Sequence, residues 1–114
     1  MKASDDGDLI QRTLDGDWDA FGGLVSRYQA STIALAMRRV GNAADAQDIA
    51  QDVFLIVYQK LRQLKHRDRF AGWLRSVTLR RCQMWWRSQA GKPDFRPIRE
   101  SAAREHFVNQ EERR

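Results

Sequence analysis

The clearest structural signal in this chain is the helical pattern of residues 45–58, which read DAQDIAQDVFLIVY. Apolar residues recur there at intervals of three and four, so we expect a helix over about residues 43–64 with one apolar stripe. The carboxylates of Asp45, Asp48 and Asp52 share a different face of this helix, because residues three and four apart lie side by side on a helix surface.

This acidic face, to which Gln51 also contributes, fits the Lys or Arg side chains of a protein partner. A solvated face on an amphipathic helix is the alternative interpretation. The carboxylates make a poor zinc site because no His or Cys lies beside them. They also make a poor catalytic pair, since nothing apolar surrounds them to shift their pKa values.

The segment that follows has the opposite charge. Residues 61–91 carry eight Lys/Arg against one Asp/Glu, whereas residues 1–60 carry six against nine. A basic surface that also carries aromatic rings suits a nucleic-acid strand, because cations bind phosphates and rings can stack on bases. An ordinary solvated basic helix is the alternative. One small chain with both surfaces predicts an adaptor, and we expect the two surfaces at opposite ends of the molecule.

The pattern along the chain predicts an all-α fold, a compact bundle of about four helices with a flexible C-terminal tail. No long stretch alternates polar and apolar residues as a strand would. Asp17 and Asn42 are natural helix caps, and Gly41 is a natural helix stop. We expect one domain over residues 1–91 and a linker over residues 92–114, where prolines and charges concentrate. The four helices are expected at about residues 5–14, 18–40, 43–64 and 70–89.

The fourth predicted helix has distinct inner and outer sides. We expect its inner side to pack against the rest of the bundle and its outer side to face a ligand or solvent. Trp85 and Trp86 are adjacent and cannot both face the same way, so we expect one of them to pack inward. The inner side comprises Phe70, Trp73, Leu74, Val77, Met84 and Trp85, and the outer side comprises Ser76, Arg80, Gln83 and Arg87.

Several function classes are disfavoured by what the sequence lacks. A single cysteine, Cys82, rules out an intrachain disulfide and argues weakly for a reducing cytosol. No apolar run approaches the roughly 20 residues needed to span a bilayer. There is no nucleophile with a paired base, no metal cluster and no Gly-rich phosphate loop. We therefore expect a soluble cytoplasmic protein that needs no cofactor or metal, does not bind membranes and is not an enzyme.

Three motifs resemble a known family. Residues 45–58 are similar to the signature of region 2 in bacterial sigma factors of the sigma-70 family, in particular the extracytoplasmic-function (ECF) subgroup. Residues 14–21, LDGDWDAF, resemble the family's "GD-x-x-AF" stretch, and residues 69–74, RFAGWL, resemble its "F-x-x-W-L" motif. The resemblance covers about residues 7–90, with the motifs in the family's order and spacing.

The resemblance implies a non-enzymatic transcription initiation factor that binds core RNA polymerase and recognises and melts the promoter −10 element. The acidic face matches the positions that contact the clamp helices of the beta-prime subunit. The connection Lys65–Arg69 matches the loop that accepts a flipped base of the non-template strand, and the next helix matches the part that follows this strand. The implied polymerase-binding residues are Asp45, Asp48, Gln51 and Asp52. The implied DNA-binding residues are Lys65, His66, Arg67, Arg69, Arg75, Arg80, Gln83 and Arg87.

The chain also departs from the family pattern. Arg80 replaces a usual Asn, Met84 replaces a frequent Asp, and Ser88 replaces the second residue of a usual Arg-Arg pair, so the base preference is left open. Family members continue into a second helical domain, region 4, to which residues 92–114 would lead. The alternative function is a sigma-like interaction module, held by an anti-sigma factor or acting as a regulator without promoter activity. An unrelated double-stranded DNA-binding bundle would leave the acidic face unexplained.

Overall fold

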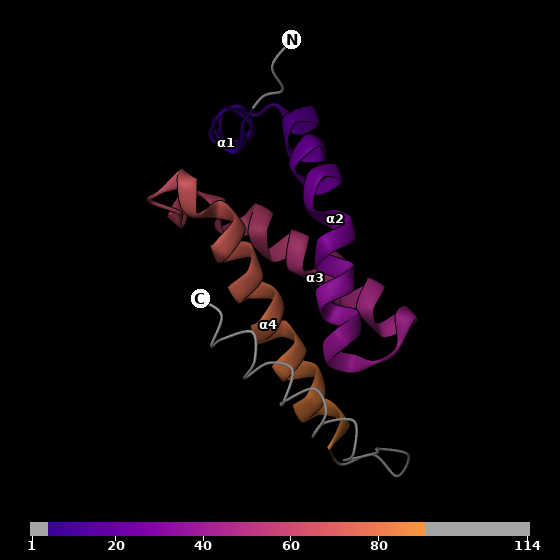
Figure 1. Cartoon of the computed structure of the whole chain (residues 1–114). Helices are drawn as coiled ribbons and strands as arrows, with labels where there is room; N and C mark the ends of the chain where they lie inside the picture. Colours follow the sequence, from indigo (N-terminus) through magenta and orange to yellow (C-terminus); the bar gives the residue numbers. More distant parts are fainter. Residues whose placement is uncertain (1–4, 91–114) are drawn as a thin grey trace.

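The computed structural model describes residues 5–90, which fold into four α-helices and two short 3-10 helices without a strand (Figure 1). The predicted all-α fold is therefore confirmed. The predicted tail, residues 92–114, lies outside the described residues. The elements are α1 (Asp6–Leu14), α2 (Trp18–Val40), α3 (Ala43–Lys60), η1 (Leu61–Gln63), η2 (Arg67–Arg69) and α4 (Phe70–Gln89).

Side-chain caps and a glycine define the helix boundaries, as the sequence predicts. The Asp17 carboxylate accepts the backbone N–H of Ala20 at the start of α2, and the Asn42 side chain accepts that of Asp45 at the start of α3. Gly41 ends α2 in the left-handed conformation with φ of 73°, which costs glycine nothing because it has no Cβ. The Gly41 stop and the Asn42 cap therefore fix where α2 ends and where α3 begins.

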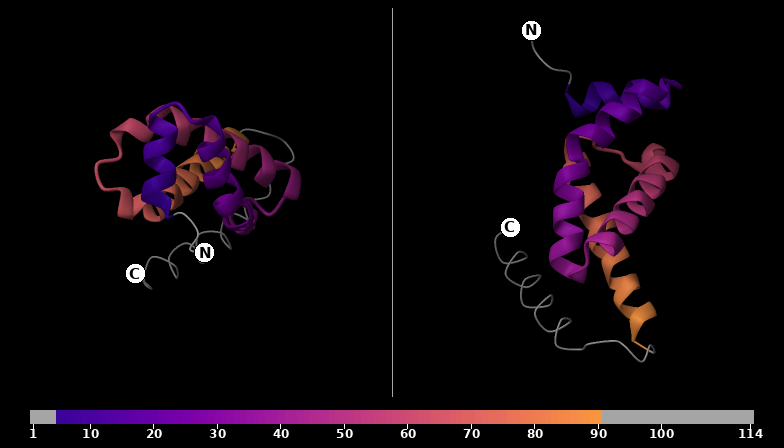
Figure 2. Two further views of the ribbon diagram at one scale, coloured as in Figure 1. Left: turned by 90° about the horizontal axis from the view of Figure 1, so that it is seen from above. Right: turned by 90° about the vertical axis from the view of Figure 1, so that its right-hand side faces the viewer.

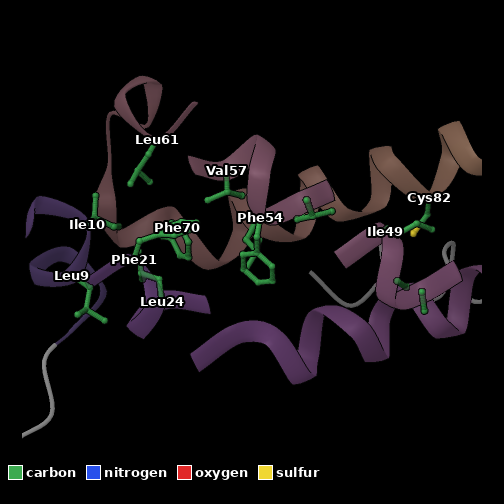
Figure 3. Packing of buried hydrophobic residues seen from close by; sticks show 14 of the residues in the cluster. Leu9, Ile10, Phe21, Leu24, Ile49, Phe54, Val57, Leu61, Phe70 and Cys82 are labelled. Carbon is green, nitrogen blue, oxygen red and sulfur yellow. The ribbon is translucent and has the colours of Figure 1, made fainter. Parts of the chain in front are cut away.

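Helix α2 is the central element and contacts α1, α3 and α4 (Figures 1 and 2). Helix α4 runs alongside it in the same direction. The Phe70 ring at the start of α4 lies 5.4 Å from the Tyr28 ring, and Trp86 near its end reaches Arg39. The core between the helices includes Ile10, Leu24, Val40, Ile49, Val53, Val57, Leu61, Phe70 and Cys82, several of which are shown in Figure 3.

Helix α1 is fastened to α2 by a polar cluster at its N-terminal end. Arg27 Nη1 lies 2.7 Å from Asp6 Oδ1, and the Tyr28 hydroxyl donates to the other Asp6 oxygen. Partial burial together with this hydrogen bond raises the pKa of Tyr28 to about 12. The cluster brings together residues more than 20 positions apart in sequence, so it is a tertiary contact between two helices.

The two glycines inside α2 have different surroundings. A Cβ built on Gly23 would lie 3.4 Å from a Leu9 methyl carbon of α1, an ordinary van der Waals contact. A Cβ on Gly22 would meet nothing within 4 Å. Close packing against a neighbouring helix therefore requires glycine at neither position.

The predicted end of the third helix, Leu64, is wrong by one turn. Helix α3 ends at Lys60, and the chain continues as the 3-10 helix η1. Leu61 is nevertheless buried and Leu64 half-buried, so the apolar stripe continues past the end of the helix. Short 3-10 turns are tighter than α-helical turns and are common at the C-terminal ends of α-helices, where the chain changes direction.

Met84 is the one residue of the predicted inner side of α4 that is wrongly placed, with 52% of its surface exposed. The same side of α4 is half-buried at Trp73 and Val77, nearer the end that η2 contacts. Met84 lies two turns beyond Val77, nearer the C-terminal end of α4. The adjacent Trp85 and Trp86 are both half-buried, so neither is fully inside or fully exposed.

Candidate protein-docking and nucleic-acid surfaces

The predicted acidic face of α3 lies on the surface of the described chain. Asp48 and Gln51 are exposed, and Asp45 and Asp52 are half-buried. Asp45 belongs to the first turn of α3, where a negative charge is favourable beside the positive end of the helix dipole. All four predicted polymerase-binding residues therefore share one accessible helix face.

An ion pair that the sequence interpretation missed joins this face to α4. Arg81 Nη2 lies 2.8 Å from Asp52 Oδ2. The pair brings one arginine of the basic segment against the acidic face, although Arg81 is not among the predicted DNA-binding residues. The expectation that the two surfaces lie at opposite ends stays a prediction. A signal for the inward direction of Arg81 was present, because it follows the buried Leu74 by seven residues and the buried Thr78 by three.

An apolar groove of about 510 Å³ lies between α2 and α3 beside the acidic face. Gln51 lines this groove and also belongs to the acidic face, and the neighbouring Leu55 is 62% exposed. Charge patterning alone does not reveal this groove, because two helices form it together. Its lining residues are Val25, Gln29, Ile33, Gln47, Ala50, Gln51, Phe54 and Leu55.

Three aromatic rings lie together where the start of α2 meets the end of α3. The Trp18 ring centroid lies 5.5 Å from that of Phe21 and 5.0 Å from that of Tyr58. Phe21 is buried, whereas Trp18 is 62% and Tyr58 45% exposed. The sequence did not predict this cluster. Trp18 directly follows the cap Asp17, and helical periodicity does not indicate whether such a first residue is exposed.

The connection between α3 and α4 is accessible and compact. Lys65, His66 and Arg69 are exposed and Arg67 is half-buried. The Arg69 backbone N–H donates to the His66 carbonyl at 2.9 Å, which closes the η2 turn. Four predicted DNA-binding residues are therefore gathered on one short surface loop between two rigid helices (Figure 1).

The outer side of α4 agrees with the prediction. Arg80, Gln83 and Arg87 are exposed, and Arg75 is half-buried. Spacings of three and four place Arg80, Gln83 and Arg87 along one side of the helix, whereas Arg75, five residues before Arg80, lies on a different side. Arg81 points elsewhere, toward α3, so the basic charge of this segment is divided between an outer row and an inward residue.

Cys82 shows how closely α4 packs at this point. It is only 2% exposed, and burial raises the pKa of its thiol to about 11 although the positive charges of Arg39 and Arg81 act in the opposite direction. Thiolate is the reactive form, so this cysteine is a core residue with little nucleophilic character. Arg39 is itself 5% exposed, and its carbonyl accepts the Trp86 indole N–H at 2.9 Å.

Among residues 5–90, no group of three or more His, Cys, Asp or Glu side chains is placed to hold a metal ion. No helix among these residues combines the length and apolar character that crossing a membrane requires.

Comparison with known proteins identifies the family. The profile of the family described as Sigma-70 region 2 matches residues 24–92, more than half of the chain. The chain is 35% identical over 78 residues to a probable RNA polymerase sigma factor, RfaY, of Xanthomonas campestris pathovar campestris, covering 68% of this chain and 20% of that protein. It is 35% identical over 74 residues to the RNA polymerase sigma-H factor of Pseudomonas aeruginosa, covering 65% of this chain and 38% of that factor. It is 34% identical over 65 residues to the ECF RNA polymerase sigma factor SigW of Bacillus subtilis, covering 57% of this chain and 35% of that factor.

The helical bundle and the matched profile define the class of protein: the chain belongs to the sigma-70 family through its region 2. Its similarity to ECF factors places it with that subgroup, as the three motifs predicted. The chain spans between a fifth and two-fifths of the length of these first relatives.

Proposed function

We propose that this chain is the part of an ECF sigma factor that binds core RNA polymerase and the non-template strand of the promoter −10 element. The observation that carries the proposal is the accessible row of acidic residues on α3, next to an accessible basic loop and helix in a chain of this family. Residues 1–91 would form the region 2 domain and residues 92–114 a linker.

The polymerase contact is assigned to the acidic face and the adjoining groove. Exposed carboxylates attract and orient Arg and Lys side chains of a partner, which gives specificity and a faster encounter. The groove supplies the apolar surface that most protein interfaces bury at their centre. We therefore expect clamp helices of the beta-prime subunit to place basic side chains near Asp48 and apolar side chains near Leu55.

The DNA contact is assigned to the connection and the outer side of α4. Unstacking a base step costs a few kcal/mol. A protein without an energy source can offset this cost only by binding the opened strand more tightly than the duplex. A loop that accepts one extruded base and a cationic helix for the neighbouring phosphates provide that preference.

A binding measurement with the variant Asp48→Arg tests the polymerase contact. We expect affinity for core RNA polymerase to fall by at least about tenfold, because the substitution places a cation where the partner presents cations. Asp19→Arg is the matched control, since Asp19 is an exposed aspartate in the first turn of α2 and lies outside the acidic face. Equal affinity of the Asp48→Arg variant and the wild type would contradict the assigned docking face.

A further inference from the structure

The ion pair between Asp52 and Arg81 connects the acidic face with α4. Its nitrogen and oxygen are 2.8 Å apart, and the two residues are separated by 29 positions in sequence. The Arg81 side chain is 27% exposed and the Asp52 side chain 45%. A partly buried pair is screened less by salt than a fully exposed one. The contact is therefore a defined tertiary link between α3 and α4.

Arg81 lies between the core and the surface. Its neighbour along α4, Cys82, is buried, and its positive charge is close enough to oppose the rise in the pKa of that thiol. The outward residue Arg80, by contrast, is exposed. A guanidinium has fixed donor directions, so a half-buried arginine holds its acceptor in a defined orientation.

This orientation matters for Asp52. Asp48 and Asp52 are four residues apart on one helix, where like charges destabilise each other. Arg81 offsets that repulsion and fixes one carboxylate oxygen, Oδ2. A carboxylate can accept hydrogen bonds at both oxygens, and nearly half of the Asp52 side chain is exposed. Asp52 can therefore bind Arg81 and still accept a cation from a partner.

We propose that Arg81 is a positioning residue for the docking face, because it orients the Asp52 carboxylate that a basic partner binds. The same ion pair links the docking face to α4, the helix assigned to the DNA contact. The inference rests on the proposed function, since the partner is taken to be core RNA polymerase. It adds a residue of the basic segment to the polymerase contact without requiring that Arg81 touch the polymerase.

A double-mutant cycle in the full chain tests this positioning role. Affinity for core RNA polymerase is measured for Arg81→Met, Asp52→Asn and the double variant. We expect Arg81→Met to weaken binding roughly five- to tenfold, and the double variant to bind no more weakly than Asp52→Asn alone, since Arg81 acts only through Asp52. Arg62→Met is the matched control, because it removes the same charge from an exposed position in η1 and should leave affinity unchanged.

A charge exchange separates the charge that position 52 presents to the partner from the stability of the link between α3 and α4. The double variant Asp52→Arg/Arg81→Asp can keep an ion pair between the helices while presenting the opposite charge to the partner. We expect it to retain the wild-type melting temperature and to lose at least about tenfold in affinity. Wild-type affinity of this variant would overturn the proposal, as would additive effects in the cycle or full affinity of Arg81→Met. A wild-type chain that does not bind core RNA polymerase would overturn the proposed function and this inference together. Wild-type affinity of the charge-exchange variant would also contradict the docking role of Asp52, whereas additive effects in the cycle or full affinity of Arg81→Met concern Arg81 alone.

Discussion

Tyr28 shows what a single residue contributes to holding the N-terminal helix in place. Its hydroxyl donates to Asp6, and partial burial and this contact raise its pKa from 10.0 to about 12. The folded state therefore keeps the phenolic proton to a higher pH than the unfolded state does. The resulting stabilisation is fully present below pH 10 and is lost as the pH rises through about 12.

This difference predicts how Tyr28→Phe changes the response to alkaline pH. The free energy of unfolding of the wild type should fall between pH 10 and about pH 12 more steeply than that of the variant, because only the wild type carries the raised pKa. Urea unfolding followed by circular dichroism at several pH values measures both slopes. Parallel slopes over this window would show that Tyr28 contributes no pH-dependent stability.

Residue types and helical spacing predict most single-residue positions, and the exceptions have physical causes. Asp48, Gln51, Arg80 and Arg87 are exposed as expected from the faces they share. Met84 is exposed because the cover over one side of a helix changes along its length, which periodicity does not record.

At the scale of elements, capping sets the start of α3 and hence the position of the acidic face. The Asn42 side chain accepts the Asp45 backbone N–H at 3.0 Å. Asn42→Ala should lower the free energy of unfolding by about 1 kcal/mol, the typical contribution of an N-cap. Asn42→Asp should retain most of the stability, because aspartate can make the same hydrogen bond.

The measurement for this cap is urea unfolding of the two variants beside the wild type. A shift of the midpoint with an unchanged slope would mean that the cap acts on stability alone. If Asn42→Ala unfolds at the wild-type midpoint, the cap does not stabilise α3.

Helix boundaries were predictable where a local signal exists and less so elsewhere. The start and end of α2 follow from Asp17 and Gly41, which act through contacts within a few residues. The end of α3 has no such signal, since its apolar stripe continues through Leu61 while the backbone has already tightened into η1. The groove between α2 and α3 and the pair between Asp52 and Arg81 depend on how helices distant in sequence pack, so no local pattern specifies them.

At the scale of the whole molecule, the two candidate surfaces lie on consecutive elements of one bundle. The acidic face lies on α3 and the basic residues lie on the following loop and α4, with the Asp52–Arg81 pair between them. In the proposed account, a rigid bundle of this kind holds polymerase and DNA at a fixed relative position. This account requires no conformational change, because the helices that carry both surfaces pack on one hydrophobic core.

The most direct test of this account asks whether one chain joins core RNA polymerase to opened DNA. The polymerase is immobilised, and a labelled single-stranded DNA pool with a randomised centre is applied with the wild type, Asp48→Arg, or Arg80→Ala/Arg87→Ala. We predict that wild type retains DNA of a defined sequence class. Asp48→Arg should lose retention while still binding DNA in free solution, and the arginine variant should lose retention while still binding polymerase. Equal DNA retention with and without the wild-type chain, or undiminished retention by Asp48→Arg, would contradict the account.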